Sequence, residues 1–245
     1  LLLRLRKKIQ EMSRLTGAPE RPEDRPPCRL QINSYSLLCG ALAALCLPRP
    51  GLCFLAWFVL APLFTFWAQN GPVFSSGFAA GLGFHGVALY WIYNTCRFAG
   101  LSPLVGVLAW ASLSALLALN WGLIAFLGQR CALSRAALRP WAWAIIWTAV
   151  SAAAERWTPR LCIDLLAYTQ WRHLALLQIG AVAGPHALGF LIIAFNAALS
   201  DVWRKLEVPK AAARINLALA MALIVGTWTY GAYELLGRPL SHSGL

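Results

Sequence analysis

The chain has 245 residues, of which 59% are hydrophobic and only 12% are charged, and its formal net charge is +12. A soluble domain carries about 25% charged residues, so this composition excludes an ordinary soluble globule and predicts an integral membrane protein with apolar surface facing lipid. The basic excess is typical of cytoplasmic loops. A nucleic-acid-binding protein is disfavoured, because the sequence offers neither a basic recognition helix nor a base-stacking groove.

Residues 1–33 differ in composition from the rest of the chain. The stretch "RLRKKIQEMSR" is basic and "GAPERPEDRPPCR" is rich in proline and charge. We expect residues 1–33 to form a flexible cytoplasmic segment, whose first 15 residues can lie as a basic helix on an anionic inner leaflet. A transmembrane domain is expected over 34–236, followed by an outer-face tail over 237–245.

The region 34–236 consists of apolar segments that are separated by short polar or proline-rich stretches. The third of them covers 24 residues, or roughly 36 Å of helix, enough to cross about 30 Å of hydrocarbon. The pattern predicts an all-α integral membrane fold, a polytopic bundle of about seven transmembrane helices. The expected spans are 34–47, 52–68, 73–96, 103–128, 141–154, 174–200 and 212–236.

The distribution of Lys and Arg predicts the orientation. With the N-terminus inside, the cytoplasmic segments hold 15 of the 21 basic residues and the outer segments hold six. This bias places the N-terminus in the cytoplasm and Leu245 outside. None of the seven cysteines forms a CxxC pair, so neither a disulfide framework nor a metal site is indicated, and no cofactor is expected.

The third segment combines glycines with large aromatic residues. In a bilayer the lipid tails are as apolar as the side chains, so the hydrophobic effect does not drive helices together. Helices associate there through close packing, which small residues allow. We therefore expect the glycines to form a helix-packing face, while the aromatic residues lie at the outer interface. The packing residues are Gly77, Gly81, Gly83 and Gly86, and the aromatic residues are Tyr90, Trp91 and Tyr93.

Four collinear motifs resemble apolipoprotein N-acyltransferase. They are "GLCFLAWFVLAPLF" (51–64), "GLGFHGVALYWIYNTCRFAGLSP" (81–103), the stretch from Trp147 through Glu155-Arg156 to "LLAYTQ" (165–170), and "GPHALGF" (184–190) leading to Asn196. The resemblance covers roughly residues 34–236. The chain departs from the family at Leu161-Cys162-Ile163, where Phe-Pro-Trp is usual, and at Ala167, where glycine is usual.

The resemblance implies a bacterial inner-membrane protein of lipoprotein maturation that moves an acyl chain from a phospholipid to a lipoprotein. It also implies that a Glu–Lys–Cys triad lies in a nitrilase-like domain, which would begin where this chain stops at Leu245. The four lysines of the chain all lie on the expected cytoplasmic side, whereas Glu155 and Cys162 lie on the other, so no triad can assemble here. We therefore expect this chain alone to bind and position acyl chains without transferring them.

Single polar residues have structural as well as functional explanations. Glu155 and Arg156 can form an interfacial ion pair or cap, or anchor a lipid headgroup. His85 and His186 are expected to be neutral and hydrogen-bonded. The residues expected to face lipid or substrate are Tyr90, Trp91, Tyr93, Glu155, Arg156, Tyr168 and Gln170.

Two other functions remain open at this point. The chain can be a stand-alone membrane subunit that recruits a separate hydrolase-like partner, or an unrelated transporter or lipid-binding protein. A transporter should show repeated halves with interrupted helices, and no such repeat is visible in the sequence.

Overall fold

The computed structural model describes residues 29–48, 50–68, 73–132, 136–156, 166–203 and 209–237. The chain divides into two compact units, 1–32 and 33–245. Of the first unit only residues 29–32 are described, and they form the first turn of a helix. The expected basic helix over 1–15, the tail after Gly237 and half of the connector 156–173 lie outside the described residues.

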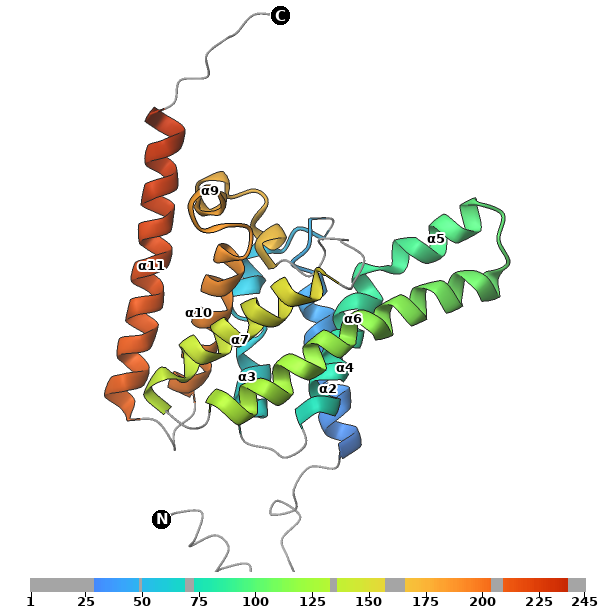
Figure 1. Ribbon diagram of the computed structural model, residues 1–245, viewed down its shortest axis with the longest axis horizontal. Helices are drawn as coiled ribbons and strands as arrows, with labels where there is room; N and C mark the ends of the chain where they lie inside the picture. The colour runs from blue at the N-terminus through green and yellow to red at the C-terminus, as the bar shows by residue number, and fades with distance from the viewer. Residues whose placement is uncertain are drawn as a thin grey trace, which may run out of the picture. The chain divides into compact units, whose positions relative to one another are not determined.

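All regular structure in the described ranges is helical, and these ranges contain no strand. Each of the seven predicted apolar segments corresponds to helix (Figure 1). The elements are α2 (Arg29–Ala44), η2 (Cys53–Trp57), α3 (Ala61–Trp67), α4 (Val73–Ala88), α5 (Tyr90–Phe98), α6 (Pro103–Ala132), η3 (Ala136–Leu138), α7 (Arg139–Ala154), η4 (Leu166–Gln170), α8 (Leu174–Leu177), α9 (Ile179–Ala183), α10 (Ala187–Trp203) and α11 (Lys210–Gly237).

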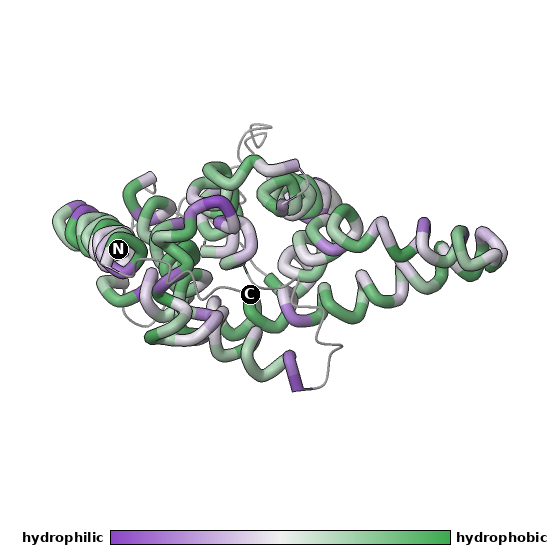
Figure 2. The backbone as a smooth tube through the Cα atoms, turned by 90° about the horizontal axis from the view of Figure 1, so that it is seen from above, coloured by the Kyte–Doolittle hydropathy of each residue, from purple (hydrophilic) through white to green (hydrophobic). Residues whose placement is uncertain are grey.

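The count of seven transmembrane helices is not confirmed. Within the described residues, two helices are long and apolar enough to cross a membrane, Pro103–Cys131 and Lys210–Gly237, and the number rises to four if two bent helix pairs are each one span. Only 33% and 22% of the most apolar stretches of the two long helices are buried in the protein. Figure 2 shows hydrophobic residues distributed over much of the helical part of the chain, as expected for surfaces that face lipid.

The predicted span 73–96 is two helices, α4 and α5, bent by 41°. The bend falls at Leu89, just after Gly86, whose carbonyl accepts a hydrogen bond of 2.9 Å from the indole Nε1 of Trp110. A side chain that engages a helical carbonyl in this way competes with the backbone ladder and favours a kink.

The predicted span 174–200 is also broken. The segment Leu174–Ala183 meets α10 at an angle of 112°. Gly184 lies between them with φ of 82°, a left-handed conformation that favours glycine, and Pro185, which cannot donate a backbone hydrogen bond, follows it. The chain therefore turns back sharply before α10 begins.

Close backbone contacts join α4 to its two neighbours. A Cβ added to Gly77 would lie 2.5 Å from the Trp121 carbonyl oxygen, and one added to Gly81 would lie 2.7 Å from the Cα of Ala118, both on α6. A Cβ on Gly83 would collide with the backbone of Leu37 on α2. Gly86 differs, because its nearest neighbour would be the Trp110 ring at 3.9 Å. Three of the four predicted packing glycines thus lie where another helix leaves no room for a side chain.

Interlocked aromatic rings fill the core between α3, α4, α6 and α7. Trp67 and Phe64 of α3 are fully buried, with ring centroids 5.5 Å apart. Trp147 of α7 packs edge-on against Trp121 of α6 at 4.9 Å. The Trp67 indole donates to the Ser76 hydroxyl at 3.0 Å, so this buried polar group is satisfied.

Candidate functional site

An apolar pocket of about 290 Å³ lies where η4, α8 and α9 meet the start of α10. Its volume is near the lower end of the range of ligand pockets, about 300–1,000 Å³. Tyr168 contributes an aromatic ring that is 44% exposed. The pocket is lined by Ala167, Tyr168, Trp171, Leu177, Gly180, Gly184, Pro185 and Leu188.

Charged groups lie beside this pocket in the chain. His186 follows the lining residue Pro185, and its Nε2 lies 3.1 Å from the Glu155 Oε1 at the end of α7. The Arg172 guanidinium lies 5.0 Å above the ring of Trp171, another lining residue. The sequence suggested Arg156 as the partner of Glu155, whereas the described contact of Glu155 is with His186. An apolar cavity with both signs of charge nearby suits an amphipathic ligand.

Gln170 lies in η4 beside the pocket residues but faces the interior, with 1% of its surface exposed. Its Nε2 donates to the Cys53 carbonyl at 2.8 Å, and its Oε1 accepts from the Trp57 indole at 3.3 Å. The side chain expected to face lipid or substrate therefore holds η2 against η4 instead.

Asn196 makes a similar connection from α10. Its Oδ1 accepts from the Leu60 amide at 3.1 Å, and its Nδ2 donates to the Ala56 carbonyl at 2.8 Å. With Gln170, it fixes the irregular segment around η2, whose backbone groups lack a full helical ladder. These two bonds join α10 to the segment that runs from η2 to α3.

The predicted aromatic group on α5 lies apart from this pocket. Tyr90 and Tyr93 stack with centroids 5.8 Å apart, and Tyr90 meets Trp110 of α6 at 6.1 Å. Trp91 is exposed. Figure 1 shows α5 and the neighbouring part of α6 projecting away from α9 and α10. The aromatic residues expected to face lipid or substrate are thus divided between the α5–α6 hairpin and the pocket beside η4.

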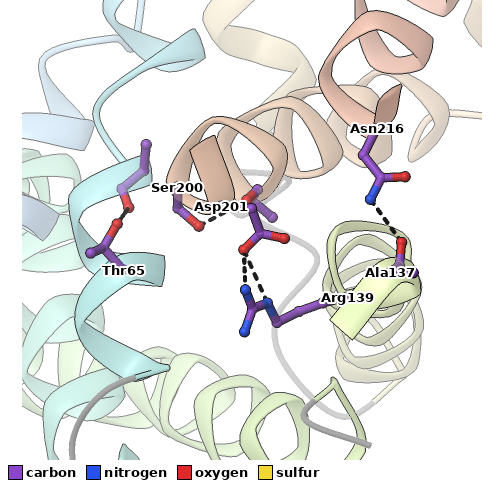
Figure 3. A network of polar contacts seen from close by, with 8 residues as sticks. Thr65, Ala137, Arg139, Ser200, Asp201 and Asn216 are labelled. Atoms are coloured by element: carbon purple, nitrogen blue, oxygen red, sulfur yellow. Dashed lines mark hydrogen bonds and ion pairs between the residues drawn. The ribbon is translucent and has the colours of Figure 1, made fainter. Parts of the chain in front are cut away.

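Sequence reasoning missed a buried ion pair at the far end of α10. The Nε and Nη2 of Arg139 donate to the Asp201 Oδ1 at 3.0 and 2.6 Å, and the two side chains are 4% and 1% exposed (Figure 3). Nearby, Asn216 of α11 donates to the Ala137 carbonyl at 2.7 Å. The signal available in the sequence was a pair of opposite charges at the ends of two apolar segments expected on the same membrane side.

Within the part of the chain that the structure describes, no group of three His, Cys, Asp or Glu side chains is arranged to hold a metal ion.

The fold and the pocket define the class as an all-helical membrane protein with a small apolar cavity. The family model for the apolipoprotein N-acyltransferase N-terminal domain matches residues 39–198. This match covers more than half of the chain, and the chain belongs to that family.

Curated relatives agree with this assignment. Apolipoprotein N-acyltransferase of a Nostoc species is 32% identical over 209 residues, which is 78% of this chain and 40% of the relative. The Geobacter metallireducens protein of the same name is 30% identical over 204 residues, or 80% of this chain and 38% of the relative. The Caulobacter vibrioides protein is 32% identical over 179 residues. The chain thus spans about 40% or less of the length of these relatives. Membership of the family overturns the alternative of an unrelated transporter.

Proposed function

We propose that this chain is the membrane domain of a protein that transfers acyl chains from phospholipid to lipoprotein, and that its role is to bind and position an acyl chain. The single observation that carries the proposal is the apolar pocket beside η4. It lies within the span that matches the family, where polar connectors meet apolar helices.

The charges near the pocket suit a phospholipid. A phospholipid headgroup carries a phosphate, which Arg172 can approach, and an amine-bearing headgroup can also meet the carboxylate of Glu155. The acyl chain then lies among Tyr168, Leu177 and Leu188. Holding a reactant in place in this way contributes to catalysis without making or breaking a bond.

We propose further that residues 1–245 alone transfer no acyl group. Glu–Lys–Cys chemistry needs a base, a cation and a thiolate within hydrogen-bond reach of one another. The lysines of this chain are Lys7, Lys8, Lys205 and Lys210, all expected on the cytoplasmic side, opposite to the segment that carries the pocket. Chemistry then depends on a nitrilase-like domain or on a separate subunit that supplies it.

The proposal also sets the orientation in the bacterial inner membrane, with the N-terminus inside. The contact between Gln170 and Cys53 supports part of this topology, because it joins the start of η2 to the connector before α8. Both segments are expected on the outer face.

Gly180 offers a clean test of the pocket. A Cβ added there meets no heavy atom within 4 Å, so Gly180→Leu can fill the cavity without moving the backbone. Gly226 of α11 is equally open and provides the matched control, Gly226→Leu. Each purified variant is equilibrated with phospholipid that carries a photoreactive acyl chain, and the crosslinked lipid is quantified. We expect Gly180→Leu to reduce crosslinking several-fold and Gly226→Leu to leave it unchanged. Equal crosslinking in both would show that the pocket is not the lipid site.

A further inference from the structure

A cysteine and a histidine meet on the surface formed by η2 and the turn after η4. The Cys53 Sγ lies 3.6 Å from the His173 Nε2, although the two residues are 120 positions apart in the chain. Cys53 is half-buried and His173 is exposed, so reagents can reach the pair. The other described histidines are engaged elsewhere, His85 with the Gly81 carbonyl and His186 with Glu155.

Gln170 holds both members of this pair in place. The side-chain Nε2 of Gln170 donates to the Cys53 backbone carbonyl at 2.8 Å. The backbone carbonyl of Gln170 accepts from the His173 backbone amide, also at 2.8 Å. Because Gln170 is 1% exposed and also bonded to Trp57, this frame has little freedom to move. A thiol and an imidazole fixed at this separation match the arrangement of a nucleophile beside its general base.

The surroundings indicate what kind of electrophile the thiol would meet. Leu52 and Phe54 flank Cys53 in the chain and both are exposed, as is Leu174 next to His173. These side chains offer an apolar surface along which a hydrocarbon chain can lie.

We propose that Cys53 and His173 form a covalent modification site that accepts the acyl group of a long-chain acyl thioester. The His173 Nε2 takes the Sγ proton, and the Cys53 thiolate attacks the thioester carbonyl. A new sulfur–carbon bond forms as the donor's carbon–sulfur bond breaks, and the departing thiolate takes the proton from the imidazolium. One thioester replaces another, so the exchange needs no oxidant or reductant.

This site is independent of the proposed acyl transfer from phospholipid. A phospholipid is an oxygen ester whose alkoxide leaves far less readily than a thiolate, so it is not expected to acylate Cys53. The two proposals can therefore fail separately.

The test uses the full 245-residue chain in detergent with palmitoyl-coenzyme A as the probe. Peptide mass mapping locates the adduct, and hydroxylamine should remove it. We expect the adduct on Cys53, none there in Cys53→Ser, and a loss of about tenfold or more in rate in His173→Gln, because a positioned base contributes at least that much. Cys131→Ser, which removes an exposed thiol far from His173 in the sequence, should leave the rate unchanged.

A second measurement tests whether His173 acts as a base or has only a structural role. The rate of Cys53 alkylation by iodoacetamide is followed from neutral pH to about pH 10, where thiols ionise without help. His173→Gln should be slow at neutral pH and approach the parent rate at alkaline pH. Equal labelling of Cys53, Cys96 and Cys131, or a His173→Gln variant that reacts like the parent chain at every pH, would overturn the proposal.

Discussion

Removal of one partner from the buried ion pair at the end of α10 should destabilise the protein strongly. Arg139 and Asp201 are both buried, and two hydrogen bonds from the guanidinium end on the same carboxylate oxygen, Oδ1. Asp201→Asn leaves the guanidinium buried without its counter-charge, which costs about 3–5 kcal/mol in comparable buried pairs. We expect Arg139→Met to lower the free energy of unfolding by a similar amount, since it removes the cation that faces the buried Asp201 carboxylate.

The double variant distinguishes a coupled pair from two independent residues. Arg139→Met with Asp201→Leu removes both charges, and replacing a buried ion pair by apolar residues is often neutral or even stabilising. Its cost should therefore be well below the sum of the two single costs. Free energies of unfolding are measured by titration of the detergent-solubilised protein with SDS.

The control is Ser200→Ala, beside Asp201 on the same helix. The Ser200 hydroxyl donates to the Ala197 carbonyl at 2.8 Å within its own helix, so its loss should cost about 1 kcal/mol or less. Single costs below about 1 kcal/mol, or costs that add in the double variant, would refute the reasoning that the pair is buried and coupled.

Further predictions concern packing, the η2–η4 connection and topology. Gly83→Ala should lower the thermal midpoint, because its Cβ collides with the α2 backbone, whereas Gly86→Ala should be neutral or slightly stabilising; equal effects would show that α4 does not pack as described. Gln170→Leu should cost about 1–3 kcal/mol, since the Cys53 carbonyl and the Trp57 indole lose their partner, and an unchanged midpoint would contradict this. In intact cells, an impermeant thiol reagent should modify Cys162 and spare Cys28, and the reverse pattern would invert the topology.

The sequence was sufficient for the all-helical character of the fold, because that character follows from local properties. Apolar segments with few charges form helices in lipid, since their backbone groups have no other partner there. Gly77 and Gly81 share a helix face by their spacing of four residues and pack against α6, whereas Gly83 lies on another face, against α2. Gly86 belongs to the same pattern, yet its neighbour is a tryptophan ring with room to spare, and only the partner helix determines that.

Breaks in helices and polar pairings depended on distant residues. The bend after α4 coincides with a bond from Trp110, and the pairing of Gln170 with Cys53 joins positions 117 residues apart. Residue type identified Gln170 as a polar group in an interfacial connector, from which an outward orientation was the natural expectation. Gln170 is buried because the irregular backbone of η2 leaves carbonyls that require hydrogen-bond donors. The local sequence around Gln170 does not predict that requirement.

The most direct test of the proposed role is site-resolved crosslinking combined with an assay for acyl transfer on the same sample. Purified chain is incubated with a phospholipid that carries a photoreactive, radiolabelled acyl chain and with a diacylated lipopeptide acceptor. We expect light-dependent crosslinks within residues 166–188, no radiolabel on the lipopeptide, and no label on the protein that hydroxylamine removes in the dark. Crosslinks spread evenly over α6 and α11, or labelled lipopeptide in the absence of any other protein, would contradict the claim that this domain binds the acyl chain without transferring it.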